Sequence, residues 1–253
     1  MAAGLGFINV NFQLNLAYGV DPSGIDFKLE TLAQNKCSAD VSSTCTNLAI
    51  QHASIESTAD ALLHDTISLK NRCSDSSCDN TASQTGKIAD NVGNKLQQII
   101  TSDNSCKSDS GCNNSVDNGA QIVDSSHGSL NTKIDQNNKC YLDSSCDNNY
   151  TGNTDVTSQN GKATENRVTQ HNTCLLSSKC ANTGSNEGSN GSYQNKQTSI
   201  CVLGAECNNT GTNNLTVGIH GASCNNSGTN TIALCTSPGH QRIINVGSHN
   251  SLH

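Results

Sequence analysis

The chain has 253 residues, a net charge of −7, 33% apolar residues, 3% aromatic residues and no tryptophan. So few large apolar side chains exclude the bulky core of an ordinary globular domain, and the acidic balance leaves no electrostatic footprint for nucleic acid. The 14 cysteines, an even number in a chain rich in Asn, Ser and Thr, predict disulfides formed in an extracellular, oxidising compartment.

Residues 1–36 precede the first cysteine and are expected to form two strands joined by a turn at 21–24. The first strand alternates amide residues with an apolar set that we take as an assembly strand: Ile8, Val10, Phe12, Leu14 and Leu16. The second, at 25–30, alternates apolar and charged residues. The segment is either a cap on its own chain or a donor strand for the next subunit. Residues 1–20 lack the charged and apolar regions of a signal peptide, so the route of export is left open.

Residues 37–179 are a regular repeat. Runs of 28 positions begin at Cys45, Cys78, Cys112 and Cys146 and each ends at another cysteine. A period near 34 is typical of stacked repeat architectures. The joints between runs vary in length, and we expect them to hang outside the stack.

Three sets of residues recur at fixed offsets within this repeat. An Asn ladder lies two positions after a cysteine: Asn47, Asn80, Asn114, Asn148, Asn182, Asn209 and Asn226. Two β-branched core columns lie 10 and 22 positions after it: Ile55, Ile88, Ile122 and Val156, then Ile67, Ile100, Ile134 and Val168. Polar neighbours flank these columns, which is the alternation of strands.

These columns predict an all-β fold, a disulfide-stapled β-solenoid of about 34-residue coils stacked about 4.8 Å apart. The Ile and Val columns would fill a narrow interior, and the Asn side chains would hydrogen-bond along their column at tight corners. A stack of helical hairpins is the alternative, since Ile88, Val92 and Leu96 have helical spacing. Later repeats are rich in Asn, Ser, Thr and Gly, which are poor helix formers.

Residues 180–235 are expected to be shortened repeats that keep the corner but lose the middle strand, so that the solenoid tapers toward the C-terminus. The cysteine spacing falls to 21 between Cys180 and Cys201 and to 17 between Cys207 and Cys224. A tail at 236–253 leaves the repeat, and its residues 243–246 are expected to add one more strand.

All the cysteines are disulfide candidates: Cys37, Cys45, Cys73, Cys78, Cys106, Cys112, Cys140, Cys146, Cys174, Cys180, Cys201, Cys207, Cys224 and Cys235. The sequence leaves two pairings open. Cys112 pairs either with Cys106 across a joint or with Cys140 at the far end of its run. Zinc is the competing use of cysteine, but no C-x-x-C motif occurs.

No group of residues suggests catalysis, so the chain is expected not to be an enzyme and to need no cofactor. Calcium is an alternative at joint carboxylates, because oxygen ligands suffice for it; the candidates are Asp75, Asp79, Asp109, Asp143 and Asp147. Six N-x-S/T sequons are glycosylation candidates, consistent with a secreted glycoprotein: Asn113, Asn149, Asn190, Asn208, Asn214 and Asn225. No stretch is long and apolar enough to span a membrane.

The repeat unit, C-x5-C-x-N-T-G-x-N ending in Q-x-N-x-C over residues 35–235, resembles Asn- and Cys-rich repeats of secreted archaeal proteins. The resemblance implies an extracellular structural role. The residues themselves indicate a subunit of an extracellular filament whose partner is another copy of the chain, joined head to tail by β-strand addition. A monomeric adhesin, an ice-binding solenoid and a surface stalk are the alternatives.

Overall fold

The computed structural model of the protein describes residues 7–17, 25–38, 44–56, 60–89, 93, 95–125, 128–158, 164–188, 191–212, 214–219, 223–229, 231–237 and 240–246. Side chains are described within 26–37, 44–56, 60–89, 93, 95–123, 128–155, 165–185, 194 and 196–210. The predicted turn at 21–24 lies outside the described residues.

The described residues form β-strands joined by short bends. The strands are β1 (Phe7–Ala17), β2 (Ile25–Ser38), β3 (Thr44–Glu56), β4 (Ala61–Ser74), β5 (Ser77–Ala89), β6 (Lys95–Lys107), β7 (Gly111–Ser125), β8 (Ser129–Tyr141), β9 (Ser145–Ser158), β10 (Thr164–Leu175), β11 (Lys179–Gly188), β12 (Gly191–Val202), β13 (Glu206–Thr212), β14 (Asn214–Ile219), β15 (Ser223–Thr229), β16 (Thr231–Ser237) and β17 (His240–Val246). The helical-hairpin alternative is therefore wrong, because Ile88 and Leu96 lie on strands β5 and β6; Val92 lies outside the described residues.

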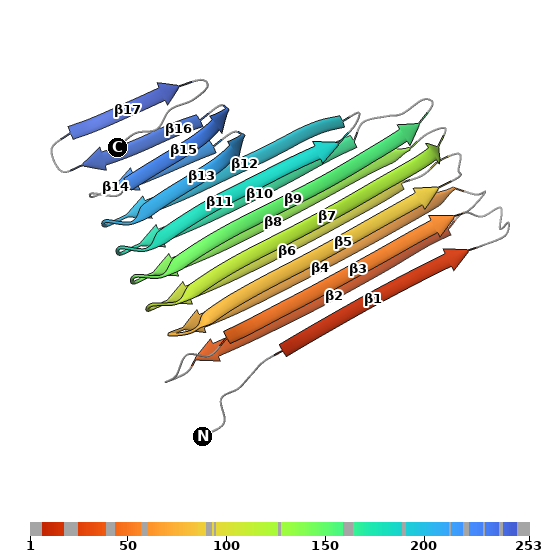
Figure 1. Ribbon diagram of the computed structural model, residues 1–253, viewed down its shortest axis with the longest axis horizontal. Helices are drawn as coiled ribbons and strands as arrows, with labels where there is room; N and C mark the ends of the chain where they lie inside the picture. The colour runs from red at the N-terminus through yellow and green to blue at the C-terminus, as the bar shows by residue number, and fades with distance from the viewer. Residues whose placement is uncertain are drawn as a thin grey trace.

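Two parallel sheets lie face to face and build a flattened β-solenoid (Figure 1). Sheet A contains the odd-numbered strands from β1 to β15, and sheet B the even-numbered strands from β2 to β16. The final strand, β17, joins sheet B antiparallel to β16. Each coil contributes one strand to each sheet, and β1 and β17 lie at opposite ends of the stack (Figure 1).

The coils stack in register. In sheet A, Cys45, Cys78, Cys112, Cys146 and Cys180 are successive partners. Ladder residues of successive regular coils are accordingly 33 or 34 positions apart in the sequence. The coil from Cys180 to Cys207 falls to 27 positions, and the coil from Cys207 to Cys224 is shorter again. The predicted period and the taper are both confirmed.

The way in which the coils shorten differs from the expectation. The shortened coils keep both strands, and each strand is shorter: β13 has 7 residues and β14 has 6. In sheet B, Gly218 pairs with Cys201 on one side and with Cys235 on the other. A glycine in the cysteine column hid one strand end, so the sequence was misread as lacking a strand.

The interior is divided along the width of the coil. The cysteines form one buried cluster at the edge where sheet B passes into sheet A. A central cluster contains the Ile67, Ile100, Ile134 and Val168 column. A third cluster, at the opposite edge, contains Ile55, Ile88 and Ile122, together with Leu63, Leu96 and Leu130. Both predicted core columns are buried as expected; the side chain of Val156 lies outside the described ones, but the residue pairs with Ile122.

The first two strands are integral to the solenoid of their own chain. β1 is paired in register with β3 from Phe7 to Ala17, and β2 is paired with β4 from Ile25 to Ser38. Leu16 pairs with Ile55 and Val10 with Ala49, so the alternating apolar positions of β1 continue the register of buried columns. Within its own chain, β1 therefore lies where the cap interpretation expects it, as the end strand of sheet A.

The joints between β-strands are themselves stacked, so the expectation that they hang outside was wrong. Asp109 N donates to Leu142 O (3.0 Å), and Asp143 N donates to Leu176 O (3.0 Å) in the next coil. Ser110, Ser144 and Ser178 are buried beneath, and each hydroxyl donates to a carbonyl within its own joint. The bridged cysteines of these joints are five or six positions apart, and the few residues between them are enough for a turn that repeats from coil to coil.

Candidate functional site

The Asn ladder is the central polar element of the interior. Six of its predicted members are buried and described: Asn47, Asn80, Asn114, Asn148, Asn182 and Asn209. The side-chain nitrogen of each of the first five donates to the side-chain oxygen of the ladder Asn in the next coil, at 2.7–3.0 Å. Asn226 pairs with Asn209 by register, and its side chain lies outside the described ones. The ladder thus fastens each coil to the next.

The ladder residues lie inside strands of sheet A, whereas the sequence placed them at tight corners. The positive-φ residues among those described are Asp, Ser, Leu and Gly residues of the joints. A second, buried Asn column on sheet B explains why Asn is needed in the strands. Asn114 Nδ2 donates to Asn138 Oδ1 (2.8 Å), and Asn138 Nδ2 donates to the Asp147 carbonyl (2.9 Å). The two columns therefore link the sheets as well as the coils.

Glutamine forms further ladders that sequence reasoning missed. Gln84 Nε2 donates to Gln51 Oε1 (3.0 Å) on sheet A. On sheet B, Gln170 donates to Gln136 and Gln197 donates to Gln170, both at 2.8 Å. The available signal was Gln four positions before Cys140, Cys174 and Cys201, which is visible over only three coils.

Six disulfides join the sheets along one edge and settle the pairing across the joints. They are Cys37–Cys45, Cys73–Cys78, Cys106–Cys112, Cys140–Cys146, Cys174–Cys180 and Cys201–Cys207. The rival Cys112–Cys140 pairing is wrong, since those residues lie in separate bridges. No described cysteine is free; the side chains of Cys224 and Cys235 lie outside the described ones.

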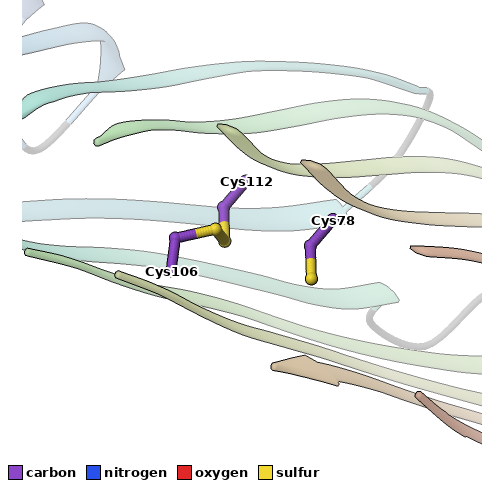
Figure 2. A group of neighbouring side chains, drawn as sticks. All are labelled: Cys78, Cys106 and Cys112. Atoms are coloured by element: carbon purple, nitrogen blue, oxygen red, sulfur yellow. A yellow bond between two sulfur atoms is a disulfide. The ribbon is translucent and has the colours of Figure 1, made fainter. Parts of the chain in front are cut away.

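The disulfides are stacked closely enough for sulfurs of successive coils to be neighbours. Figure 2 shows the Cys106–Cys112 bridge with the Cys78 sulfur beside it. Two groups of cysteines hold three sulfurs within 4.8 Å of one another, Cys78 with Cys106 and Cys112, and Cys140 with Cys146 and Cys180. Metal binding needs thiolates, whereas all six of these cysteines are in disulfides.

The calcium candidates do not come together. Asp75, Asp109 and Asp143 lie exposed on the joints, whereas Asp79 and Asp147 lie on strands β5 and β9 of sheet A. Among the side chains that the structure describes, only the two cysteine groups bring three metal-ligand atoms within 4.8 Å. The structure therefore offers no assembled carboxylate site within those residues.

Asp65 is a buried carboxyl inside the coil, on β4 between Leu63 and Ile67. It is 1% exposed, and its two oxygens have no hydrogen-bond partner. Burial raises the pKa of Asp65 to about 7, and the neighbouring Gln98 side chain opposes this with a smaller lowering effect. A carboxyl in this position is held neutral in mildly acidic solution, where an unfolded one would be charged.

The outer faces of both sheets are mostly polar, with a few outward apolar residues such as Ile50 on sheet A and Leu32 on sheet B. Three sequons, Asn113, Asn149 and Asn208, face outward on sheet A; the side chains of Asn190, Asn214 and Asn225 lie outside the described ones. Burial raises the pKa of the Asp79 and Asp147 carboxyls above their usual range.

On sheet B a groove of about 530 Å³ is lined by Lys70, Arg72, Asp103, Lys139 and His171, among others. Burial, then Lys139 and Lys196, lower the pKa of His171.

An apolar rim runs along the joints of the later coils. It consists of Tyr141, Leu142, Leu175, Leu176, Val202 and Leu203. Leu142, Leu176 and Leu203 are 40%, 40% and 47% exposed and have φ of 56–59°. Neither the exposure nor the left-handed backbone favours leucine. The two preceding joints have Ser74, Asp75, Lys107 and Ser108 at the corresponding positions, so the rim belongs to the second half of the stack.

The two ends of the stack are open sheet edges. Within the described residues, β1 and β2 end the sheets at one end, and β15 and β17 end them at the other. Such edges present rows of backbone groups that can pair with another strand.

No protein-family profile, curated protein or solved structure matches the chain. Within the part of the chain that the structure describes, there is no helix able to cross a membrane. Function is therefore inferred from the solenoid alone.

Proposed function

We propose that the protein is a structural, non-catalytic subunit of an extracellular filament, assembled head to tail by β-strand addition. The observation that carries the proposal is the pair of open ends. β1 presents an 11-residue edge at one end of sheet A, and β15 presents a 7-residue edge of the same strand direction at the other end. A contact between unlike ends does not close on itself, so it propagates into a fibre.

The pairing of β1 with β3 refines how strand addition works here. β1 need not leave its own sheet, because only one of its edges is used by β3 within the described residues. Its second edge is then the donor for β15 of the next copy. On the other sheet, β2 would pair with β17 in the opposite direction, since β17 runs antiparallel to β16.

The extracellular setting is supported by the six disulfides, which persist in oxidising compartments. The proposal includes glycosylation of outward sequons such as Asn113 and Asn149. The resemblance of the repeat to those of secreted archaeal proteins suggests a source for such filaments.

The ice-binding alternative is not favoured by the outward residues. A face that binds ice needs a regular array of threonines, whereas the column three positions after the sheet A cysteines contains Leu48, Thr81, Ser115, Asn149 and Thr183. No observation favours an adhesin or a stalk over a filament.

The test is electron microscopy of the purified oxidised protein, with and without residues 1–20. We expect filaments from the full chain and folded monomers from the truncated one, and a peptide of residues 7–17 should cap growing ends. A chain lacking residues 247–253 is the control for shortening as such, because it leaves the β1, β15 and β17 edges in place. Filaments of unchanged appearance from the chain without residues 1–20 would show that β1 is only a cap.

A further inference from the structure

The two outer faces of the solenoid carry opposite charge beside the disulfide edge. On sheet A, the outward residues within five positions after the column cysteine include an acidic strip of Asp79, Asp117 and Asp147, and no cation among those described. On sheet B, those within five positions before the cysteine include a basic strip: Lys36, Lys70, Arg72, Lys139 and Lys196. The carboxylates described among them are Asp103 and Asp135, and Asp135 is paired with Lys133 (3.1 Å).

Two cation–carboxylate pairs of the strips are matched in position. Arg72 and Asp79 flank the same disulfide, Cys73–Cys78, on opposite faces, and Lys139 and Asp147 flank Cys140–Cys146 in the same way. Both strips are built from the same coils, so their rows have the same spacing of about 4.8 Å along the axis. A second copy shifted along the normal to the sheets, without rotation, brings Arg72 over the partner's Asp79 and Lys139 over the partner's Asp147.

The carboxyls of the acidic strip are poorly solvated, which favours a cationic neighbour. Burial raises the pKa of both Asp79 and Asp147, so their charged forms lack full hydration. Arg72 and Lys139 are exposed and long enough to reach outward from sheet B. A cation placed over each carboxylate would replace the missing hydration.

We propose that solenoids pack side by side, with the basic strip of one copy against the acidic strip of a second copy and their axes parallel. The contact joins unlike faces, so it extends into layers. It uses the flat sides of the molecule, whereas the filament contact uses its ends, so each can exist without the other. Glycans on Asn113 or Asn149 would occupy the acidic face, so lateral packing belongs to the unmodified chain.

The first test measures association of unglycosylated protein by light scattering at two salt concentrations. Screening acts over about 30 Å at about 0.01 M salt and over about 3 Å at about 1 M. We expect lateral assemblies at low salt and at least about a tenfold loss of them at high salt. Carbodiimide coupling of mixed light and heavy-isotope protein should join Lys139 of one copy to Asp147 of another. Protein that does not associate laterally at low salt overturns the proposal.

Charge variants locate the contact. The triple variant Asp79→Asn, Asp117→Asn and Asp147→Asn should lose the low-salt assemblies. The matched control, Asp75→Asn, Asp109→Asn and Asp143→Asn, makes the same charge change on the joints and should keep them. Asn is well suited to those positive-φ joint positions, so the control is expected to fold. Equal loss in both triples overturns the proposal, because net charge alone would then explain it.

Charge reversal provides a test by rescue. One variant replaces Lys70, Arg72 and Lys139 by Glu, and the other replaces Asp79, Asp117 and Asp147 by Lys. Each should stay unassociated alone, while a mixture of the two should regain assemblies, because each supplies the complement of the other. Circular dichroism checks that both are folded. A folded pair that does not associate on mixing overturns the proposal, as does wild-type protein that binds a polyanion such as polygalacturonate through the basic strip without self-association.

Discussion

The two edges of the flattened coil are built from different chemistry and extend over different lengths of the stack. The disulfide edge, with the Asn ladder beside it, runs to Cys207 and Asn209 in the described side chains. Among the described side chains, the apolar edge, with Ile55, Leu96 and Ile122 in its cluster, runs from β2 to β8. The coils taper by losing the apolar edge.

This difference shows which part of the coil is sufficient for stacking. A disulfide, an Asn pair and a Gln or Ser beside them persist when the coil shortens to 27 residues. The apolar columns add buried area and set the width of the coil, but they are not what keeps successive coils in register. Directional hydrogen bonds between identical side chains penalise a shift of one residue, whereas apolar packing is non-directional.

The largest effect is expected from breaking the disulfide edge. Each bridge closes a short loop and contributes about 2 kcal/mol, so the loss of all six described bridges approaches the whole net stability of a typical domain. Reduced protein should unfold, and residues 180–212 should exchange amide hydrogens before residues 77–158, because they lack the apolar edge. Hydrogen exchange with mass spectrometry after reduction measures this. Simultaneous exchange of both regions would mean that the apolar edge does not stabilise its coils separately from the disulfide edge.

The next effect concerns Asp65 near the apolar edge. An unfolded Asp ionises with its ordinary pKa of 3.8, whereas the folded carboxyl stays neutral up to about pH 7. Unfolding therefore releases a proton in this range, and stability should fall as the pH rises through it. Asp65→Asn should raise the free energy of unfolding by on the order of 4 kcal/mol at about pH 8 and have little effect at about pH 4. Denaturant titrations at the two pH values measure it, with outward-facing Asp117→Asn as the control. A pH-independent gain would argue against a neutral buried carboxyl.

A smaller effect separates the inward and outward sides of one strand. Asn114→Ala removes donors and acceptors at the junction of four buried Asn side chains and should cost about 1–3 kcal/mol. Asn113→Ala, its outward neighbour, should cost less than about 0.5 kcal/mol. Chemical denaturation of the two variants gives the comparison. Equal costs would contradict the interpretation that the Asn ladder keeps successive coils in register.

The smallest effect is expected on the apolar rim. Leu176 has φ of 57°, and Asn accepts that backbone more readily, so Leu176→Asn should stabilise the protein by about 1 kcal/mol. Leu175→Asn, at the adjacent half-buried position, is the matched control and should give no gain. Thermal melting of both variants measures the change in stability. A loss of stability in Leu176→Asn would mean that the exposed leucines contribute contacts worth more than the strain.

The sequence predicted the solenoid because several of its columns hold the same kind of residue in successive coils. Asn114 and Ile122 recur at fixed offsets from a cysteine, and such columns have one simple explanation, in-register stacking. The bridge at Cys106–Cys112 remained undecided beforehand, because pairing depends on which strand ends face each other in space.

The misread parts are those where a joint changes length or a column changes residue. The stacked joints were missed because their lengths vary, which drew attention away from the serine that recurs two positions before Cys78, Cys112, Cys146 and Cys180. Gly218 concealed a strand end by replacing a cysteine. The left-handed Leu142 could not be predicted, since that backbone selects Gly or Asn, and only the repeated turn imposes it on leucine.

The placement of the disulfides has a mechanical consequence. Each bridge closes a joint, so a chain pulled along its length can release from each regular coil only the run between bridges, such as that from Cys78 to Cys106. Extended chain spans about 3.5 Å per residue, so each rupture should lengthen the molecule by about 100 Å, and by about 120 Å once the bridges are reduced. A fibre built from such coils would yield in equal steps and dissipate energy at each one, while every joint stayed tied.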